Sequence, residues 1–183
     1  VMSIQHHNSD SFIEELIVRR ELAYNFVYYN EQYDDFSHMT YQWAYQTMNA
    51  HQFDHREYLY KLEDYINFRT HDPYFNTAMK EMVYNGYMHG YMRMYWAKKV
   101  IEWSPSYVKA YEILTYLNNY YFLDGNTHNG FTGIAWCFGK HDRAWKERVI
   151  FGKIRYMNSN GLKRKFNIEE YVKRIQEKVD DYE

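Results

Sequence analysis

A single arginine, Arg93, stands in a segment of methionine, aromatic, glycine and histidine residues that reads MHGYMRMYW over positions 88–96. A guanidinium in such apolar surroundings loses its hydration and therefore needs a carboxylate partner. We pair Arg93 with Asp124, which follows at a later turn. Such a pair would stabilise the guanidinium and fix nitrogen–oxygen dipoles that point at a bound ligand. An ordinary ion pair or a solvent-exposed arginine is the alternative that the spacing leaves open.

Two tryptophans, Trp96 and Trp103, have the spacing that places side chains on one face of a helix. Packing in the core is the common use of such a stripe, and a row of rings that conducts electrons is the functional interpretation. Glu15, in EELIVRREL, also has two interpretations. It is either a surface acid paired with Arg19 one turn later or a residue of a site.

The motifs of common catalytic and metal sites are missing from the sequence. His51, Asp54 and His55 in HQFDH have helical spacing, but no further ligand pair accompanies them. The sequence contains no HExxH, phosphate-binding loop, GxGxxG or serine-hydrolase motif. We therefore predict no metal site.

Positive charge is concentrated in one segment although the formal net charge is only −2. Residues 140–166 hold nine lysines and arginines against two acids, Asp142 and Glu147. Such a cluster is typical of a surface that binds a polyanion, and a solvated face without a partner is the alternative.

The elements that must position these residues are predicted to be helices. The chain is 21% aromatic, which excludes disorder, and only two prolines interrupt it. We expect helices over 12–29, 39–52, a short stretch of 55–67, 73–85, 88–103, 106–121 and 167–180. The first should bury one stripe formed by Phe12, Leu16, Ala23 and Phe26. Residues 123–133 are predicted to be a loop, and 134–158 to be less regular.

The same composition indicates one all-α domain without a membrane span. No apolar run reaches the length needed to cross a bilayer, and no signal peptide is visible. The single cysteine, Cys137, excludes an intramolecular disulfide and is typical of a reducing, intracellular compartment.

Four segments together resemble the C-terminal flavin domain of class II DNA photolyases, the enzymes that repair cyclobutane pyrimidine dimers. They read SFIEELIVRRELAYNF, THDPYFNTAMKEMVYNGYMHGYMRMYWAKKVIEW, YLNNYYFLDGNTHNGFTGIAW and WKERVIFGKIRYMNSNGLKRKF, and they span residues from about 11 to 166 with the family's order and spacing. The resemblance implies that residues 1–183 form the C-terminal portion of a photolyase/cryptochrome-type helical FAD-binding domain.

The cofactor that the resemblance implies is FAD. Arg93 and Asp124 then lie beside the flavin ring, and His89 belongs to the same set of cofactor-binding residues. Asn118 is assigned to the position near flavin N5, and Asn129 is the competing candidate for that position.

The resemblance also assigns residues to the lesion and to electron transfer. Glu15 would hydrogen-bond the dimer, Met94 would face the lesion pocket, and Trp136 would form the wall on which the flipped dimer packs. Three rings are assigned to photoreduction of the flavin: Trp96, next to FAD, with Trp103 and Tyr60 as outer members.

The family pattern has a tryptophan where this sequence has Phe75, in HDPYF. Phenylalanine is harder to oxidise than tryptophan, so we expect the electron path to be cut or rerouted there.

The function implied is light-driven repair of pyrimidine dimers in DNA by an electron from reduced FAD. The basic segment would then face the DNA, with these residues in contact: Arg143, Trp145, Lys146, Arg148, Lys153, Arg155, Lys163 and Arg164. The antenna domain and the loop that holds the flavin phosphates in the family precede the resembling segments and have no counterpart in this chain. We therefore expect an upstream segment or chain to complete the flavin site.

Two other functions remain open at this point. A shortened photolyase descendant would keep the fold and a binding surface without redox turnover. A blue-light receptor of the cryptochrome type is disfavoured because Glu15, Met94 and Trp136 are all retained.

Overall fold

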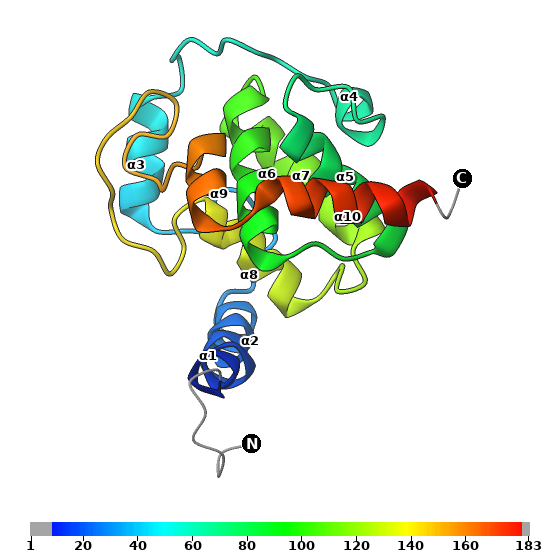
Figure 1. The fold of residues 1–183 in the computed structure, drawn as a ribbon. Helices are drawn as coiled ribbons and strands as arrows, with labels where there is room; N and C mark the ends of the chain where they lie inside the picture. Colours follow the sequence, from blue (N-terminus) through cyan, green and yellow to red (C-terminus); the bar gives the residue numbers. More distant parts are fainter. Residues whose placement is uncertain (1–8, 181–183) are drawn as a thin grey trace.

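The computed structural model describes residues 9–180, and within this range it is a helical bundle (Figure 1). The helices are α1 (Ser9–Ile13), η1 (Glu14–Arg19), α2 (Arg20–Tyr28), α3 (Gln42–Ala50), α4 (Leu62–Ile66), α5 (Pro73–Asn85), α6 (Gly90–Trp103), α7 (Tyr107–Tyr121), α8 (His128–Cys137), α9 (Ser159–Lys165) and α10 (Ile168–Asp180). The only strand-like pairing among the described residues is one isolated bridge between Arg148 and Gly152. The all-α prediction is confirmed. None of the helices between residues 9 and 180 has the length and apolarity that crossing a bilayer requires.

Local capping sets the ends of the helices that carry the site. The Asp72 side chain accepts hydrogen bonds from the backbone N–H groups of Tyr74 and Phe75, and Pro73 occupies the first turn of α5. Gly86 ends α5 with a φ of 63°, a conformation that glycine adopts without a Cβ clash. Ser106 caps α7 through the N–H of Lys109. These boundaries agree with the predicted ones.

Helix α6 lies in the middle of the bundle and contacts α5, α7 and α8 (Figure 1). Its buried residues occupy every side of the helix, as expected for an element without a solvent face. Even Lys98 is fully buried, and its Nζ donates to the carbonyl oxygen of Cys137 at the end of α8 at 2.5 Å. Burial lowers the pKa of Lys98 to about 8. The central helix therefore holds Arg93 in a fixed frame.

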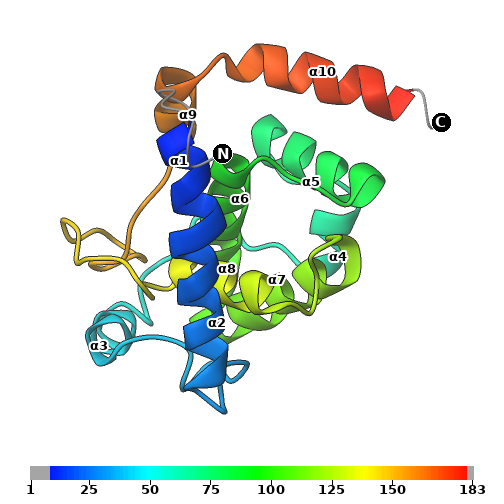
Figure 2. The same ribbon diagram turned by 90° about the horizontal axis from the view of Figure 1, so that it is seen from below.

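The last helix, α10, lies across α5, as both views show (Figures 1 and 2). Its buried side includes Tyr171 and Ile175. The Tyr171 hydroxyl donates to the buried Glu81 of α5 at 2.5 Å, which satisfies a carboxylate that would otherwise be stranded in the core.

Two local predictions were wrong in extent. Residues 128–133, predicted as part of a loop, belong to α8 (His128–Cys137), because the Thr127 side chain caps the helix and Gly130 permits close packing. A Cβ on Gly130 would lie 2.7 Å from Nδ2 of Asn118. Residues 159–165, for which we predicted no element, form α9, capped by Asn158. Helix α3 is shorter than predicted, whereas the short helix expected within 55–67 is confirmed as α4 at 62–66.

The first helix does not bury the predicted stripe along its whole length. Ala23 and Phe26 are 0% and 4% exposed, whereas Phe12 and Leu16 are 52% and 45% exposed. Helix α2 provides most of the first helix's packing against α8, where the Tyr24 and His128 rings stack at 3.8 Å. Figure 2 shows α1, η1 and α2 as one long helix on the outside of the bundle.

Candidate functional site

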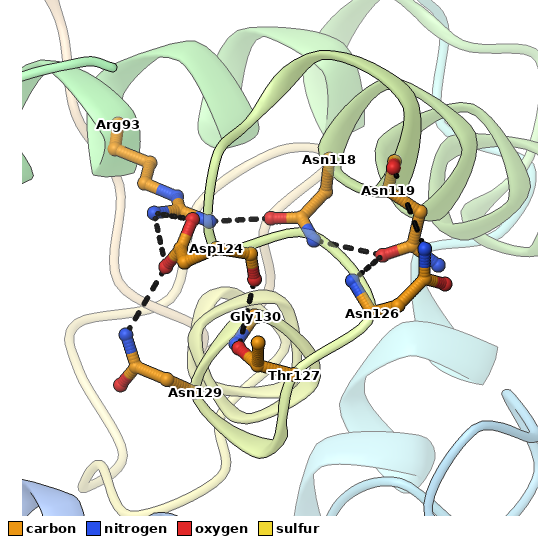
Figure 3. Close-up of polar contacts among 8 residues, drawn as sticks. All are labelled: Arg93, Asn118, Asn119, Asp124, Asn126, Thr127, Asn129 and Gly130. Atoms are coloured by element: carbon orange, nitrogen blue, oxygen red, sulfur yellow. Dashed lines mark hydrogen bonds and ion pairs between the residues drawn. The ribbon is translucent and has the colours of Figure 1, made fainter. Parts of the chain in front are cut away.

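Four side chains from three helices and one turn form a cluster at the Arg93 guanidinium (Figure 3). Arg93 Nη1 donates to both carboxylate oxygens of Asp124, at 3.1 and 3.0 Å, and its Nη2 donates to Oδ1 of Asn118 at 2.5 Å. Nδ2 of Asn129 donates to the Asp124 carboxylate at 3.2 Å. Helix α6 supplies the arginine, α7 and α8 supply the asparagines, and the turn between α7 and α8 supplies the aspartate. We call this set, Arg93, Asn118, Asp124 and Asn129, the arginine cluster.

The pairing of Arg93 with Asp124 is confirmed, but the pair is only half-buried. The side chains of Arg93 and Asp124 are 24% and 35% exposed. The guanidinium lies over the ring of Phe122 at 3.9 Å, which supports it on one side by a cation–π contact. The pair is held in place and is still accessible to a ligand.

The two asparagines differ in access. Asn118 is 0% exposed, and its Nδ2 donates to Oδ1 of Asn119 at 2.9 Å. Asn119 in turn accepts from the N–H of Asn126 at 3.1 Å, so this chain of amides braces the turn (Figure 3). Asn129 lies on the exposed side. Asn118 therefore orients Arg93 from behind, and Asn129 has surface open to a ligand.

A second group of side chains joins the first helix to α8. Glu15 forms an ion pair with Arg19 at 3.1 Å, and the Arg19 guanidinium lies 5.4 Å from the centre of the Trp136 ring. Trp136 is half-buried and also contacts the ring of His141 at 5.4 Å. Glu15 and Arg19 lie in the π-helical turn η1, and such turns often occur at functional sites. The sequence analysis named Arg19 only as the partner of Glu15 and missed its contact with Trp136.

Two other predicted site residues, His89 and Met94, lie at the N-cap of α6 and within α6. His89 is exposed and caps the helix, since its Nδ1 accepts from the N–H of Tyr91 at 3.2 Å. Met94 is half-buried and packs against the core beside Arg93. No hydrogen bond joins His89 to the side chains of the arginine cluster among the described residues.

The predicted electron-transfer rings are buried or half-buried and pack in the hydrophobic core. Nε1 of Trp96 donates to the sulfur of Met79 at 3.1 Å, and its ring contacts Phe122 at 5.8 Å. Trp103 contacts Tyr60 at 5.5 Å and Phe75 at 5.1 Å. These contacts are what core packing requires, and conduction stays a prediction.

The basic segment is irregular but anchored. Trp145 lies between two guanidinium groups, with Arg143 at 4.9 Å and Arg155 at 4.5 Å from its ring centre. Arg155 also pairs with Asp142 at 3.0 Å, and the Asp142 side chain is 8% exposed. Burial raises the pKa of Asp142, but hydrogen bonds from Arg155, the Arg143 N–H and Trp145 outweigh it and lower the pKa overall.

Most of the predicted DNA contacts are accessible. The exposed members are Arg143, Trp145, Lys146, Arg148, Lys153, Lys163 and Arg164. Arg155 is half-buried. All of them belong to α9 or to the segment before it.

A metal centre is not supported. In the part of the chain that the structure describes, no group of three or more histidine, cysteine or acidic side chains is arranged to hold a metal ion. His51 and Asp54 of HQFDH contact each other at 2.6 Å, but the third side chain that joins them is Glu147 from the basic segment rather than His55.

The chain is similar to proteins named deoxyribodipyrimidine photo-lyase. The one from Methanothermobacter thermautotrophicus is 57% identical over 170 residues, which is 93% of this chain and 38% of that protein. The one from Oryza sativa subsp. japonica is 50% identical over 89% of this chain and 32% of its own length, and the one from Arabidopsis thaliana is 48% identical over 93% and 34%. The chain thus spans about a third of the length of these relatives. No protein-family model matches it.

Proposed function

We propose that this chain is the C-terminal part of the flavin- and DNA-binding domain of a class II deoxyribodipyrimidine photo-lyase, acting in light-driven repair of cyclobutane pyrimidine dimers. The arginine cluster carries the proposal, because a pair proposed from sequence as a ligand-holding group assembles at a half-exposed surface. The similarity to proteins of that name over 93% of the chain supports it.

The arginine cluster fits a flavin. The edge of an isoalloxazine carries carbonyl oxygens and ring nitrogens that accept hydrogen bonds, and Arg93 and Asn129 present donors at the accessible side of the cluster. Bound in its reduced form, FAD supplies the electron that light delivers to the dimer. Arg93 and Asn129 then orient the ring, and Asp124 and Asn118 keep the guanidinium in one position.

The group around Trp136 fits a flipped pyrimidine dimer. A half-buried indole offers a stacking face, and Arg19 and Glu15 place hydrogen-bonding groups beside it. Enzymes that act on bases must take them out of the stack before chemistry, and an aromatic wall is the usual receiving surface. In this proposal Trp136 packs on the dimer and Glu15 accepts a hydrogen bond from it.

The basic segment and α9 supply the phosphate contacts. Exposed lysines and arginines there release counterions when DNA binds, so they contribute affinity without reading sequence. The Trp145 stack between Arg143 and Arg155 fixes the direction of two of these charges.

The test separates lesion recognition from backbone binding in the 183-residue chain. Trp136→Ala should weaken binding of dimer-containing duplex by the ~1–3 kcal/mol of a lost base stack and leave undamaged duplex unaffected. Arg148→Ala should weaken binding of both duplexes alike. The affinities are measured by fluorescence titration at one salt concentration.

The outcomes separate the proposed functions. If Trp136→Ala weakens both duplexes equally, Trp136 serves packing and the lesion site is overturned. If no variant differs from the parent chain in DNA affinity, the chain is better explained as a shortened photolyase descendant without repair activity.

A further inference from the structure

The residues Lys146 to Lys153 form a tight turn that carries three exposed cations, Lys146, Arg148 and Lys153, and we call it the basic turn. The backbones of Arg148 and Gly152 pair in both directions, at 2.9 and 2.7 Å. Ile150 and Gly152 have positive φ values, 66° and 51°. A turn of this shape needs external contacts, because a β-branched residue with positive φ is strained.

Contacts from α3 and the loop after it supply that support. The Ile150 N–H donates to Asp54 at 2.7 Å, and the Lys153 N–H donates to the Thr47 hydroxyl at 2.9 Å. The backbone at Gly152 approaches α3 so closely that a Cβ would lie 2.1 Å from the Thr47 hydroxyl oxygen. The Tyr107 hydroxyl donates to the Ile150 carbonyl from the other side.

His51 ties the turn to α3 through two acids. Its Nδ1 contacts an Asp54 carboxylate oxygen at 2.6 Å, and its Nε2 contacts a Glu147 carboxylate oxygen at 3.0 Å. His51 is 17% exposed, Asp54 is 26% exposed and Glu147 is 56% exposed. The imidazole therefore bridges an acid of its own loop and an acid of the basic turn.

The two contacts determine the charge of the ring. An ionised carboxylate only accepts hydrogen bonds, so both ring nitrogens must carry a proton for both bonds to form. Glu147 and Asp54 are the charged groups that face His51, and Arg56 lies beyond Asp54. Hydrogen bonds to Glu147 and then Asp54 raise the pKa of His51, and burial opposes them only in part.

We propose that His51 is a positioning residue that holds the basic turn in its DNA-binding arrangement in acidic to neutral solution and loosens it as pH rises. The inference rests on the proposed DNA-binding function. It concerns none of the residues that would touch the lesion or the flavin.

The direction follows from linkage. A histidine whose pKa is higher in the folded chain contributes its full stabilisation below the unfolded value of about 6.5, and this is lost as pH rises through the raised value. Neutral His51 keeps one N–H. The Asp54 contact is shorter and less exposed, so the Glu147 bond is the one released. Without it, one side of the basic turn is free to move.

The first experiment follows the His51 ring by NMR in the 183-residue chain without DNA, with the signal assigned by its loss in His51→Gln. We expect a titration midpoint above 6.5, and a lower midpoint in Glu147→Gln because one carboxylate charge is gone. A wild-type midpoint at or below 6.5 overturns the inference.

The second experiment measures affinity for undamaged duplex at pH 6 and pH 8.5 at fixed salt. Glu147→Gln still contacts neutral His51, since an amide N–H can donate to the unprotonated ring nitrogen. The wild-type chain should therefore lose about 3- to 5-fold more affinity than Glu147→Gln across this range, the size expected for one partly exposed ion pair. Glu112→Gln, which removes an equally exposed acid of an ion pair on α7, should keep the wild-type profile.

The two hypotheses fail in different ways. Binding with the same pH profile in wild type, His51→Gln and Glu147→Gln overturns the positioning role alone. If the wild-type chain binds no duplex at either pH, the DNA-binding function is overturned, and the positioning role with it.

Discussion

Each residue of the arginine cluster holds the next one in place. Asp124 accepts two hydrogen bonds from Arg93 and a third from Asn129, while Asn118 fixes the other guanidinium nitrogen. Phe122 supports the flat face of the guanidinium. Because Nη1 contacts Asp124 and Nη2 contacts Asn118, the guanidinium has a defined direction as well as a charge, which lysine at the same position would not supply.

Removing Arg93 should therefore destabilise the fold and not only the site. In Arg93→Ala, Asp124 loses its counterion, and Asn118, fully buried, loses a donor. Because water reaches the pair, we expect a loss of about 1–3 kcal/mol in the free energy of unfolding, less than for a fully buried pair. Urea unfolding measures this as a lower midpoint at an unchanged slope.

The control is Arg20→Ala. Arg20 also pairs with a carboxylate, that of Glu21, but both side chains are about half exposed, at 49% and 54%. The same measurement should show little change. Equal losses in the two variants would mean that the cluster contributes no more than a surface ion pair.

At the scale of elements, the first helix combines two environments. Its second half is fastened to α8 by Ala23, Phe26 and the Tyr24–His128 stack. Its first half, α1 and η1, exposes Phe12, Leu16 and Val18. The π-helical turn η1, which directly precedes α2, changes the direction in which successive side chains point.

The exposure of this first half predicts how substitutions there affect the free energy of unfolding. Leu16→Ala should change the free energy of unfolding by no more than about 0.5 kcal/mol, because a side chain that remains in water leaves no cavity. Leu114→Ala, at a position 0% exposed in α7, should cost about 2–5 kcal/mol. Thermal or urea unfolding compares the two. A large loss in Leu16→Ala would show that this face is covered when the chain is in solution.

At the scale of the whole molecule, charge is distributed unevenly. The chain is nearly neutral overall, but nine of its 22 lysines and arginines lie in residues 140–166. A concentrated positive surface attracts DNA at long range even when the net charge does not.

Binding of undamaged duplex should therefore depend steeply on salt. Log affinity should fall linearly with log salt concentration, and Lys163→Ala should reduce the slope by about one unit if it neutralises one phosphate. Lys178, exposed on α10 outside the basic segment, provides the matched control, and Lys178→Ala should leave the slope unchanged. Equal reductions in the two variants would place the phosphate contacts elsewhere.

The sequence by itself determined those features that depend on neighbours along the chain. Asp72-Pro73, Asn85-Gly86 and Ser106 mark helix ends because caps and backbone conformations are decided within a few residues. Only two prolines interrupt the chain, and this composition indicated an all-helical bundle. A guanidinium in apolar surroundings needs a carboxylate, and this requirement identified Asp124 as the partner of Arg93.

Only the tertiary structure decided what depends on distant neighbours. We predicted Gly130 as a loop residue, but it lies in α8. The absence of a Cβ there allows α8 to approach Asn118 of α7. Arg19 meets Trp136, and His51 meets Glu147, across more than ninety intervening residues. No local pattern encodes such contacts, because they form only when packing of the core brings separate helices and turns together. For the same reason, Phe12 and Leu16 matched an apolar stripe in the sequence, yet about half of each side chain is exposed in the structure.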